Sequence, residues 1–187
     1  MHPTGHIEVL EVTEPGSDVL TADAFRAAFR SHPAGVAVVT ADPGGDPIAM
    51  TVSSLTSISA SPPLMAFSAS AQSSSTAALR RATSVVVHLL NAEQLWLAQL
   101  GATTGVDRFQ DPTKWRRLPT GEPVFPDGGT WIRGEVVHRV EAGNAVIHVV
   151  KAIETNSSAE SSSDASGVGP LVYHNRSWHV LSDASMI

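Results

Sequence analysis

The feature that most constrains the fold of this chain is a succession of short apolar segments divided by turn-forming residues. Short segments rich in β-branched residues are typical of strands in antiparallel sheets. We predict strands at residues 35–40, 48–54, 64–68, 85–90, 131–141, 145–153, 170–173 and 178–181. A set of strands this dense favours a mainly β fold, an antiparallel barrel with a few short helices.

One predicted strand, at residues 131–141, is expected to have a face in water. Apolar and charged residues alternate along it, which is typical of a half-buried strand. Its apolar side is formed by Ile132, Val136 and Val140, and its charged side by Arg133, Glu135, Arg139 and Glu141. The Asp, Pro and Gly residues at 42–47 predict a hairpin between the first two strands.

The first predicted helix begins after Thr21, a residue type that caps helices well. Phe25 and Phe29 fall on one face at helical spacing, and Pro33 and Gly35 end the helix. Preceding it, residues 1–20 show no periodicity, which indicates an arm that is either disordered or laid over another subunit.

Two further short helices are predicted between the strands. One begins in the run Ser73 to Thr76, and the other begins at Asn91, with Gln94 completing a capping box, and stops at Gly101. Residues 155–169 are rich in Ser, Ala and Gly, and we interpret them as a mobile loop between strands. Residues 21–183 are expected to form one domain.

Composition excludes several classes of function. With 42% apolar residues, 16% charged residues and a net charge of −6, the chain is typical of a globular protein without affinity for nucleic acid. The absence of cysteine excludes disulfides and thiolate chemistry, so redox activity would need a cofactor. No apolar run is long enough for a membrane span, and no signal-peptide pattern is present, so a cytoplasmic location is expected.

A cluster of hydroxyl side chains at residues 50–57 is the first candidate site. Hydroxyls and backbone N–H groups suit a heteroaromatic ring system that carries several acceptors. The alternative is that these Ser and Thr residues only face solvent on a strand, and composition alone favours that alternative.

The run Ser73 to Thr76 is the second candidate site. Free N–H groups and the positive end of a helix dipole suit a phosphate, and Arg80 and Arg81 follow one turn later. An ordinary serine N-cap, or a low-complexity serine tract, would give the same pattern.

Metal sites and several enzyme classes find no support in the sequence. The eight histidines include no helical pair at i, i+4 and no His-Glu-x-x-His, so no metal site is predicted. His88 and His148 lie in β-branched runs and are interpreted as satisfied core or dimer residues. Serine-hydrolase elbows, Walker loops and Gly-x-Gly-x-x-Gly are absent from the sequence.

Several of these segments together resemble the flavin reductase-like, FMN-binding split-barrel proteins. The resemblance runs from about residue 25 to residue 181. The matching pieces are Phe25-Arg26, 33–40, Thr51-Val52-Ser53-Ser54 leading to Pro62-Pro63-Leu64, 73–80, 85–90, Asp107-Arg108-Phe109, and 170–174 before Trp178. It implies a Greek-key-like split β-barrel that forms homodimers with flavin bound near the subunit interface.

The resemblance also implies roles for individual residues toward FMN or FAD. The ring and ribityl chain would be lined by Met50, Thr51, Val52, Ser53 and Ser54, and bordered by Ser68, Ala69 and Ser70. The phosphate would be held by Ser73, Ser75 and Thr76, with Arg80 nearby, and the site closed or braced by Asp107, Arg108 and Phe109. Without the family, this last triplet would read as a surface ion pair beside a core aromatic residue. The nicotinamide region would include Pro33, Gly35, Gly143 and Asn144.

The chain departs from the family pattern at two places. A lysine often precedes the serine cluster, and Ala71 stands there instead. Family members often carry Gly-Asp-His where this chain has Gly143-Asn144-Ala145, and that histidine is linked to nicotinamide binding or hydride delivery. The second change weakens the expectation for NADH or NADPH more than the expectation for flavin.

The function that the resemblance implies is an NAD(P)H-dependent flavin reductase that supplies reduced flavin to a partner monooxygenase. Flavin would carry the electrons, so no side chain is required as a general acid or base. Two alternatives stay open: an FMN-binding oxidoreductase of the same fold with another electron donor, and a flavin-binding protein without enzymatic activity.

Overall fold

The computed structural model describes residues 20–157 and 168–187 of the chain. Nearly all of the predicted arm and most of the predicted loop lie outside these described residues. Seven strands form the main antiparallel sheet, in the order β3-β2-β6-β9-β10-β5-β4. They are β2 (Ala37–Ala41), β3 (Ile48–Val52), β4 (Thr56–Ala60), β5 (Pro63–Ser70), β6 (Ser84–Leu89), β9 (Thr130–Ala142) and β10 (Ala145–Thr155).

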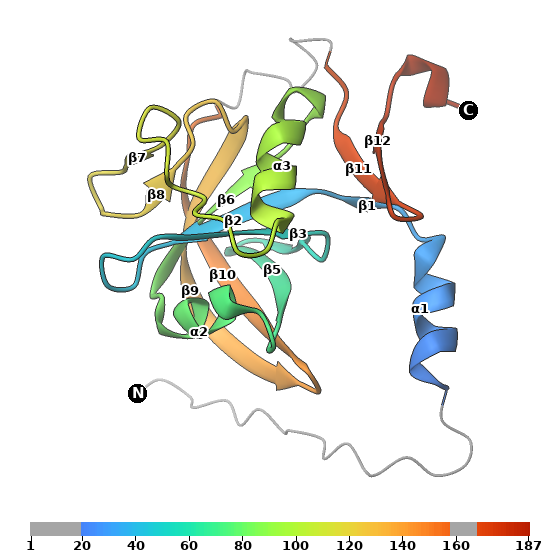
Figure 1. The fold of residues 1–187 in the computed structure, drawn as a ribbon, viewed down its shortest axis with the longest axis horizontal. Coiled ribbons are helices and arrows are strands. Elements are labelled where there is room, and N and C mark those ends of the chain that lie inside the picture. The colour runs from blue at the N-terminus through green and yellow to red at the C-terminus, as the bar shows by residue number, and fades with distance from the viewer. Residues whose placement is uncertain (1–19, 158–167) are drawn as a thin grey trace.

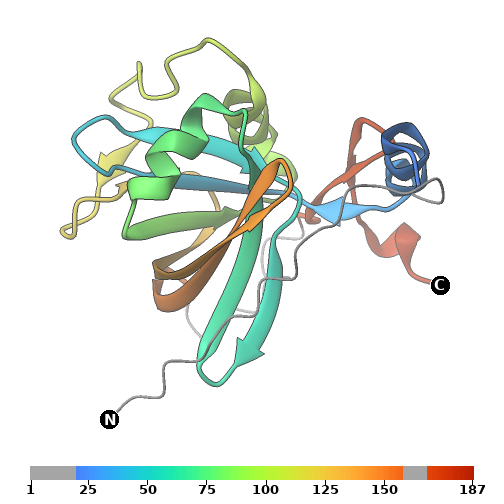
Figure 2. The same ribbon diagram turned by 90° about the horizontal axis from the view of Figure 1, so that it is seen from below.

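Figure 2 shows that this sheet is strongly curved, and a hydrophobic core lies on its inner side. The core is built by side chains from β2, β5, β6 and β10, including Val39, Phe67, Val87 and Val150, each at most 1% exposed. The ladder ends at β3 and β4, which do not pair with each other in the described part of the chain. The mainly β, antiparallel fold with a few short helices is therefore confirmed, and the sheet is split between these two edges.

A smaller lobe stands beside the main sheet (Figures 1 and 2). It consists of helix α1 (Ala22–Arg30) and a three-stranded sheet of β1 (Ala34–Gly35), β11 (Leu171–His174) and β12 (Ser177–Val180). The expectation that the last two strands complete the barrel was wrong. Instead, β11 pairs with β1, the short segment in front of β2.

The helices begin largely where the sequence predicts. In α1 the Thr21 hydroxyl oxygen accepts a hydrogen bond from Ala24 N, 3.2 Å away. Helix α2 (Ser74–Arg81) follows Ser73, and the predicted capping box at Asn91 is present before a 3-10 turn (Ala92–Gln94) and α3 (Leu95–Ala102). A final 3-10 turn spans Asp183–Ser185. In the described residues no helix is both long and apolar enough to cross a membrane.

Strand β4 was missed by the sequence analysis. Its sequence, Thr-Ser-Ile-Ser-Ala, contains no buried residue, because it is an edge strand paired only with β5. A strand without a buried face lacks the apolar alternation on which prediction depends.

The expected faces of β9 are correct only in its first half. Val136 lies opposite Val150, but the register shifts at the next pairs, so Arg139 lies opposite His148. A bulge of this kind moves later side chains to the other face. Arg139 therefore shares the inner face with Val136, and its guanidinium donates to the Ala82 carbonyl at the end of α2.

The outer face of β9 is also less exposed to water than expected. A small hairpin of β7 (Arg116–Arg117) and β8 (Pro123–Val124) places Glu122 beside Arg133, whose Nε donates to Glu122 Oε1 over 2.9 Å. The two side chains are only 4% and 14% exposed. Burial by itself would raise the pKa of Glu122, but the hydrogen bonds from Arg133, Ser84 and Thr120 together outweigh it and lower the pKa to about 2.

The two histidines placed in the core differ in their partners. His88 is satisfied: Nδ1 lies 3.2 Å from Val38 O, and Nε2 accepts from Phe125 N over 3.1 Å. His148 is fully buried against Phe67, but neither ring nitrogen has a hydrogen-bond partner in the described part of the chain. His148 is therefore a core residue, as expected, but it is not satisfied within the described chain, and the alternative of a dimer residue stays a prediction.

Candidate functional site

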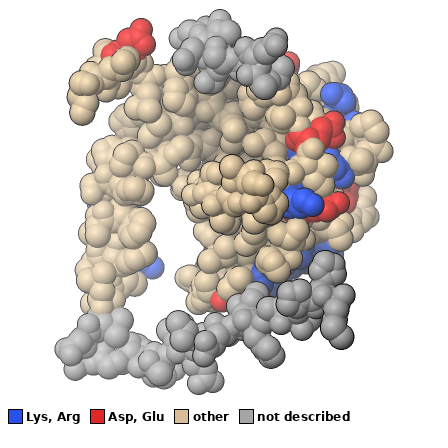
Figure 3. All heavy atoms as spheres, turned by 180° about the vertical axis from the view of Figure 1, so that it is seen from behind, with Lys and Arg blue, Asp and Glu red and all other residues tan. Residues whose placement is uncertain are grey.

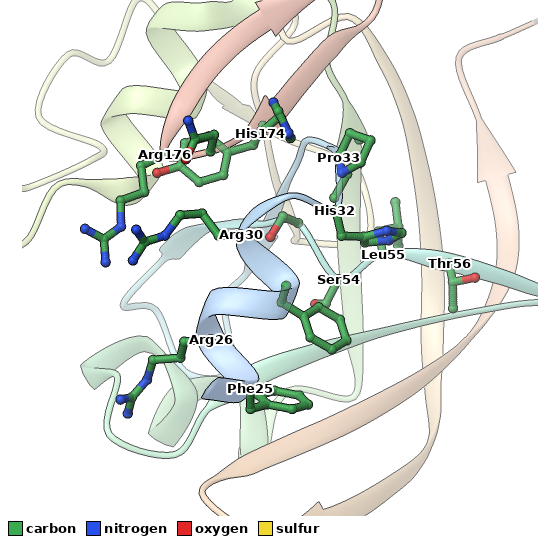
Figure 4. Close-up of a pocket in the computed structure, with 16 residues that line it drawn as sticks. Phe25, Arg26, Arg30, His32, Pro33, Ser54, Leu55, Thr56, His174 and Arg176 are labelled. Atoms are coloured by element: carbon green, nitrogen blue, oxygen red, sulfur yellow. The ribbon is translucent and has the colours of Figure 1, made fainter. Parts of the chain in front are cut away.

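A cavity of about 840 Å³ lies between the α1 lobe and the split edge of the main sheet. Figure 3 shows a hollow between the two parts of the molecule, and Figure 4 shows the lining side chains. Its walls come from four places in the sequence: α1, the segment around β1, the end of β3 with the start of β4, and the β11–β12 turn. The lining residues are Phe25, Arg26, Phe29, Arg30, His32, Pro33, Ala34, Gly35, Ser53, Ser54, Leu55, Thr56, Tyr173, His174, Asn175 and Arg176.

The cavity brings together four residues that the sequence analysis placed in two different sites. Ser53 and Ser54 were assigned to the flavin ring, and Pro33 and Gly35 to the nicotinamide region, and all four line this space. A volume of this size is within the range of small-molecule and cofactor pockets.

The other predicted residues of β3 are turned away from the cavity. The Thr51 hydroxyl donates to Ala98 O of α3 over 2.6 Å. A Cβ on Gly101 would come within 2.5 Å of Thr51 Oγ1, so only glycine permits this close approach of α3. Met50 and Val52 pack against the main core. None of Met50, Thr51 and Val52 lines the cavity.

Ser54 joins the end of β3 to β5. Its hydroxyl donates to Ser68 O over 3.1 Å and accepts from Ser68 N over 2.9 Å. Ala69 is buried in the core, and Ser70 ends the strand, where its carbonyl accepts from the Thr76 hydroxyl over 2.6 Å. A continuous path of hydrogen-bonded residues therefore leads from the cavity wall to the first turn of α2.

The backbone N–H groups in the first turn of α2 receive no capping hydrogen bond from the side chain of Ser73. Ser73 occupies the N-cap position in an extended conformation but makes no side-chain capping bond. Ser75 and Thr76 are 3% and 1% exposed, so their side chains belong to the protein interior. The Thr76 hydroxyl is bound to Ser70 O and Ser75 is buried, so of the predicted phosphate residues Ser73 is the one that combines partial exposure with a hydroxyl that makes no capping bond.

Arg80 is already paired in this chain. Its guanidinium forms a two-pronged contact with Glu141, in which Nη2 and Oε2 are 2.8 Å apart. That hydrogen bond lowers the pKa of Glu141 and raises the pKa of Arg80. The positive charge predicted for a phosphate is thus largely neutralised by Glu141.

Gly143 and Asn144 do not line the cavity; they lie close to the segment between β5 and α2. They form the β9–β10 turn, where Asn144 O accepts from Ala71 N over 2.9 Å and Ala145 lies opposite Ser70. Within one chain, the residues expected in the nicotinamide region therefore separate into two groups, one in the cavity and one beside α2.

Arg108 and Phe109 also lie away from the cavity. Arg108 Nη2 donates to Thr103 O over 2.7 Å, and Phe109 packs against Phe125 and Trp115 in a second core cluster beneath α3. The phenylalanine acts as a core aromatic residue in this chain. Asp107 accepts a hydrogen bond from Phe109 N over 2.9 Å. It pairs with no arginine among the described residues, so the surface ion pair expected without the family resemblance is absent there.

The remaining lining residues were missed as site residues. They give the cavity an aromatic side, formed by Phe25 and Phe29, and a basic side, formed by Arg26, Arg30 and Arg176; Figure 4 shows the labelled arginines leaving α1 on the side opposite Phe25. Among residues 20–157 and 168–187, none of those that line the cavity is a carboxylate, although the chain carries a net charge of −6. The sequence shows that Phe25 and Phe29, and likewise Arg26 and Arg30, are four residues apart and so share a helix face. It does not show that α1 lies beside the β11–β12 turn.

Comparisons with known proteins agree with this fold. Residues 29–182 match the model of the flavin reductase like domain family. The chain is 38% identical over 178 residues to a NADH:FMN oxidoreductase of Rhodococcus qingshengii, covering 95% of this chain and 91% of the relative. It is 29% identical over 130 residues to the reductase component of a 4-nitrophenol 4-monooxygenase/4-nitrocatechol 2-monooxygenase of Rhodococcus opacus, covering 70% and 69%.

A solved structure is similar over most of its length. The crystal structure of a flavin reductase domain protein from Arthrobacter sp. FB24 superposes with a TM-score of 0.76 at 30% sequence identity. The match covers 85% of this chain and 94% of that one.

Proposed function

Because this chain belongs to the flavin reductase-like domain family, we propose that it is an NAD(P)H-dependent flavin oxidoreductase that holds FMN or FAD non-covalently. One observation carries the proposal: Ser53 and Ser54, expected around the flavin ring, and Pro33 and Gly35, expected around the nicotinamide, line the same cavity. Transfer of a hydride requires the two rings in contact, so a single space must admit both.

The residues along the cavity wall and α2 fit a flavin mononucleotide. Ser53 is exposed in the cavity and its hydroxyl has no hydrogen-bond partner among the described residues, so it is able to bind a ring or ribityl acceptor. The cavity wall is connected to α2 through Ser54, Ser68 and Ser70. At the start of α2, the Ser73 hydroxyl and the N–H groups of the first turn would bind the phosphate. When bound, flavin supplies a ring system that accepts two electrons and a proton from a reduced nicotinamide.

The protein's own contribution is binding and orientation. Pro33 and Gly35 border the space for the donor, and a Cβ on Gly35 would meet no atom within 4 Å, so room remains there for a ring. The described part of the chain contributes no carboxylate to the cavity, and no general acid or base is needed for the transfer. Ala145, where the family pattern has a histidine, does not line the cavity, so this departure leaves the cavity walls unchanged.

A homodimer forms part of the proposal. Helix α1 has no buried residue, and Phe25 and Phe29 are 51% and 58% exposed with ring centroids 4.6 Å apart. Exposed aromatic pairs on an amphipathic helix are typical of protein interfaces. A second copy of the chain would cover this face and border the cavity.

We further propose that reduced flavin serves a partner monooxygenase in the cytoplasm. Support comes from the Rhodococcus opacus relative, whose name makes it the reductase component of a monooxygenase. Flavin reduced in an open cavity is able to leave and reach a second protein, and a cavity between a lobe and an open sheet edge meets that requirement.

Mixing the purified protein and flavin with NADH or NADPH in a stopped-flow instrument tests the activity. We expect the flavin absorbance to bleach and free FMN to sustain turnover. Bleaching with neither donor would favour an oxidoreductase with another donor, and flavin binding without turnover would favour a carrier.

The phosphate position is tested by Ser73→Ala. Because Ser73 makes no capping bond, the melting temperature should hold. A neutral hydrogen bond to a charged group contributes about 1.5–3 kcal/mol, so FMN should bind at least about tenfold more weakly while riboflavin affinity stays unchanged. Ser57→Ala, an exposed serine on β4 outside the cavity, is the control; equal losses for both ligands would place the phosphate elsewhere.

A further inference from the structure

Two arginines from distant parts of the sequence are held side by side at the basic side of the cavity. Arg30 ends α1, and Arg176 lies in the β11–β12 turn. The two elements are joined by a backbone hydrogen bond in which Asn175 N donates to Arg30 O over 3.1 Å. Both side chains line the cavity, and Figure 4 shows them extending in the same direction.

These two guanidinium groups lack the partners that other arginines of the chain have. Arg80, Arg117 and Arg133 each bind a carboxylate. Within residues 20–157 and 168–187, the side chains of Arg30 and Arg176 make neither an ion pair nor a hydrogen bond, and no acidic residue lines their cavity. Two positive charges without a partner in the described part of the chain therefore face a space that no described carboxylate lines.

The backbone at Arg176 adds a second observation. Asn175 and Arg176 have φ angles of 48° and 63°, the left-handed conformations of a tight hairpin turn. Asn-Gly is the preferred pair for such a turn, because glycine alone adopts the second position without strain. An arginine at this position costs stability, so its side chain is expected to compensate through an interaction that the chain by itself does not contain.

The chemistry of this arrangement selects phosphate groups. Guanidinium forks bind phosphate oxygens in pairs, and two adjacent forks match two adjacent phosphates. In the proposed function the flavin phosphate binds at Ser73, which is separated from the cavity by the hydrogen-bonded residues Ser54 and Ser68. The remaining phosphate groups are those of the nicotinamide dinucleotide. Its diphosphate would bind Arg30 and Arg176, because these arginines share the cavity with Pro33 and Gly35, the residues expected near the nicotinamide.

We propose that Arg30 and Arg176 bind the diphosphate of the electron donor and so fix the donor in the cavity. The inference rests on the proposed function. Because the diphosphate does not take part in the chemistry, the two arginines are binding residues, and their loss should raise KM while kcat is maintained.

The test uses Arg176→Gly and Arg30→Gln, with Arg116→Gln as the control. Arg116 is an exposed arginine on β7 outside the cavity and carries the same charge. Glycine at position 176 relieves the left-handed strain, so Arg176→Gly should melt at the same or a higher temperature than the unchanged protein. Any functional loss in this variant is then separate from a folding defect.

We expect each cavity variant to raise the KM for NADH about tenfold, with kcat within about twofold, and the control to change neither. ADP-ribose, which carries the diphosphate without the nicotinamide, gives a readout independent of turnover. Calorimetric titration should show about tenfold weaker ADP-ribose binding in the two cavity variants, and high salt should weaken binding to the unchanged protein more than to Arg176→Gly.

Unchanged donor KM and ADP-ribose affinity in Arg176→Gly and Arg30→Gln would overturn the inference, while donor oxidation by the unchanged protein would leave the proposed function standing. Weaker FMN binding with an unaltered donor KM would also overturn it, because the arginines would then bind the flavin phosphate. Failure of the unchanged protein to oxidise NADH or NADPH with flavin would instead reject the proposed function.

Discussion

His88 makes the folded state sensitive to acid. It is fully buried, and burial lowers its pKa from 6.5 to about 4, against a smaller opposing effect of the Val38 carbonyl. The unfolded chain therefore takes up a proton at a higher pH than the folded chain does. Stability due to this residue is complete above pH 6.5 and is lost as the pH falls from 6.5 toward 4.

We predict that the free energy of unfolding falls by about 2 kcal/mol between pH 7 and pH 5 from His88 alone. The pKa of His148 is also lowered by burial and by the charge of Arg139, so it adds to the loss in the same direction. Urea unfolding at several pH values measures the effect. A stability that stays constant over this interval would contradict the assignment of a neutral, buried imidazole.

The unpartnered ring of His148 predicts a stabilising substitution. The ring centroids of His148 and Phe67 are 5.0 Å apart and the two ring planes differ by 5°, so the site already holds an aromatic ring stacked on Phe67. His148→Phe should raise the free energy of unfolding by about 1–3 kcal/mol, because two buried nitrogens without partners are removed.

His88→Phe is the matched control for that substitution. It deprives Val38 O and Phe125 N of their partners and should lower the free energy of unfolding by a similar amount. Denaturant unfolding of both variants at pH 7.5 compares them. The same sign of change in both would show that hydrogen bonding does not distinguish the two histidines.

Among the elements, α1 is the one whose sequence and environment disagree. Its apolar face is well formed, yet it packs on nothing within the described chain. We predict that Phe25→Ser with Phe29→Ser converts a dimer to a monomer in sedimentation-velocity runs, with the far-ultraviolet circular dichroism spectrum unchanged. The side chains are more than half exposed, so the fold of the single chain does not depend on them.

Val106→Ser serves as the control for the helix variant, because Val106 is a similarly exposed apolar residue in a loop outside the cavity. It should leave the sedimentation coefficient unaltered. A double variant of α1 that sediments like the unchanged protein would remove α1 from the interface.

For the whole molecule, the two parts should differ in local stability. In β2 every residue is buried, whereas β12 has no buried residue and α1 has none either. We predict that backbone amides of α1 and β12 exchange with deuterium well before those of β2 and β6, and that ADP-ribose slows exchange at the lobe. Mass-spectrometric exchange measurements resolve these segments. Equal protection of both parts would mean that the lobe and the main sheet open together.

Much of the fold could be predicted from local signals. The strand segments, the Thr21 cap and the Asn91 capping box follow from side-chain period and from short-range hydrogen bonds, which depend on neighbours in the sequence. The candidate site was predicted less well: Ser53, Ser54, Pro33 and Gly35 line the cavity, whereas Thr51 and Val52 serve packing. Ser53 and Ser54 come after the end of β3 and border the cavity, whereas Thr51 and Val52 lie within the paired strand, so the point at which the strand ends decides which residues of the motif reach the cavity.

The sequence by itself determined that this chain forms an antiparallel sheet with short capped helices, because periodicity and capping are local properties. Only the tertiary structure decided which of its residues meet. The bulge in β9 turned Arg139 inward, and the pairing of β1 with β11 brought Arg176 beside Arg30. Such contacts depend on the register between strands far apart in the chain, and a change of one residue in that register moves a side chain to the opposite face.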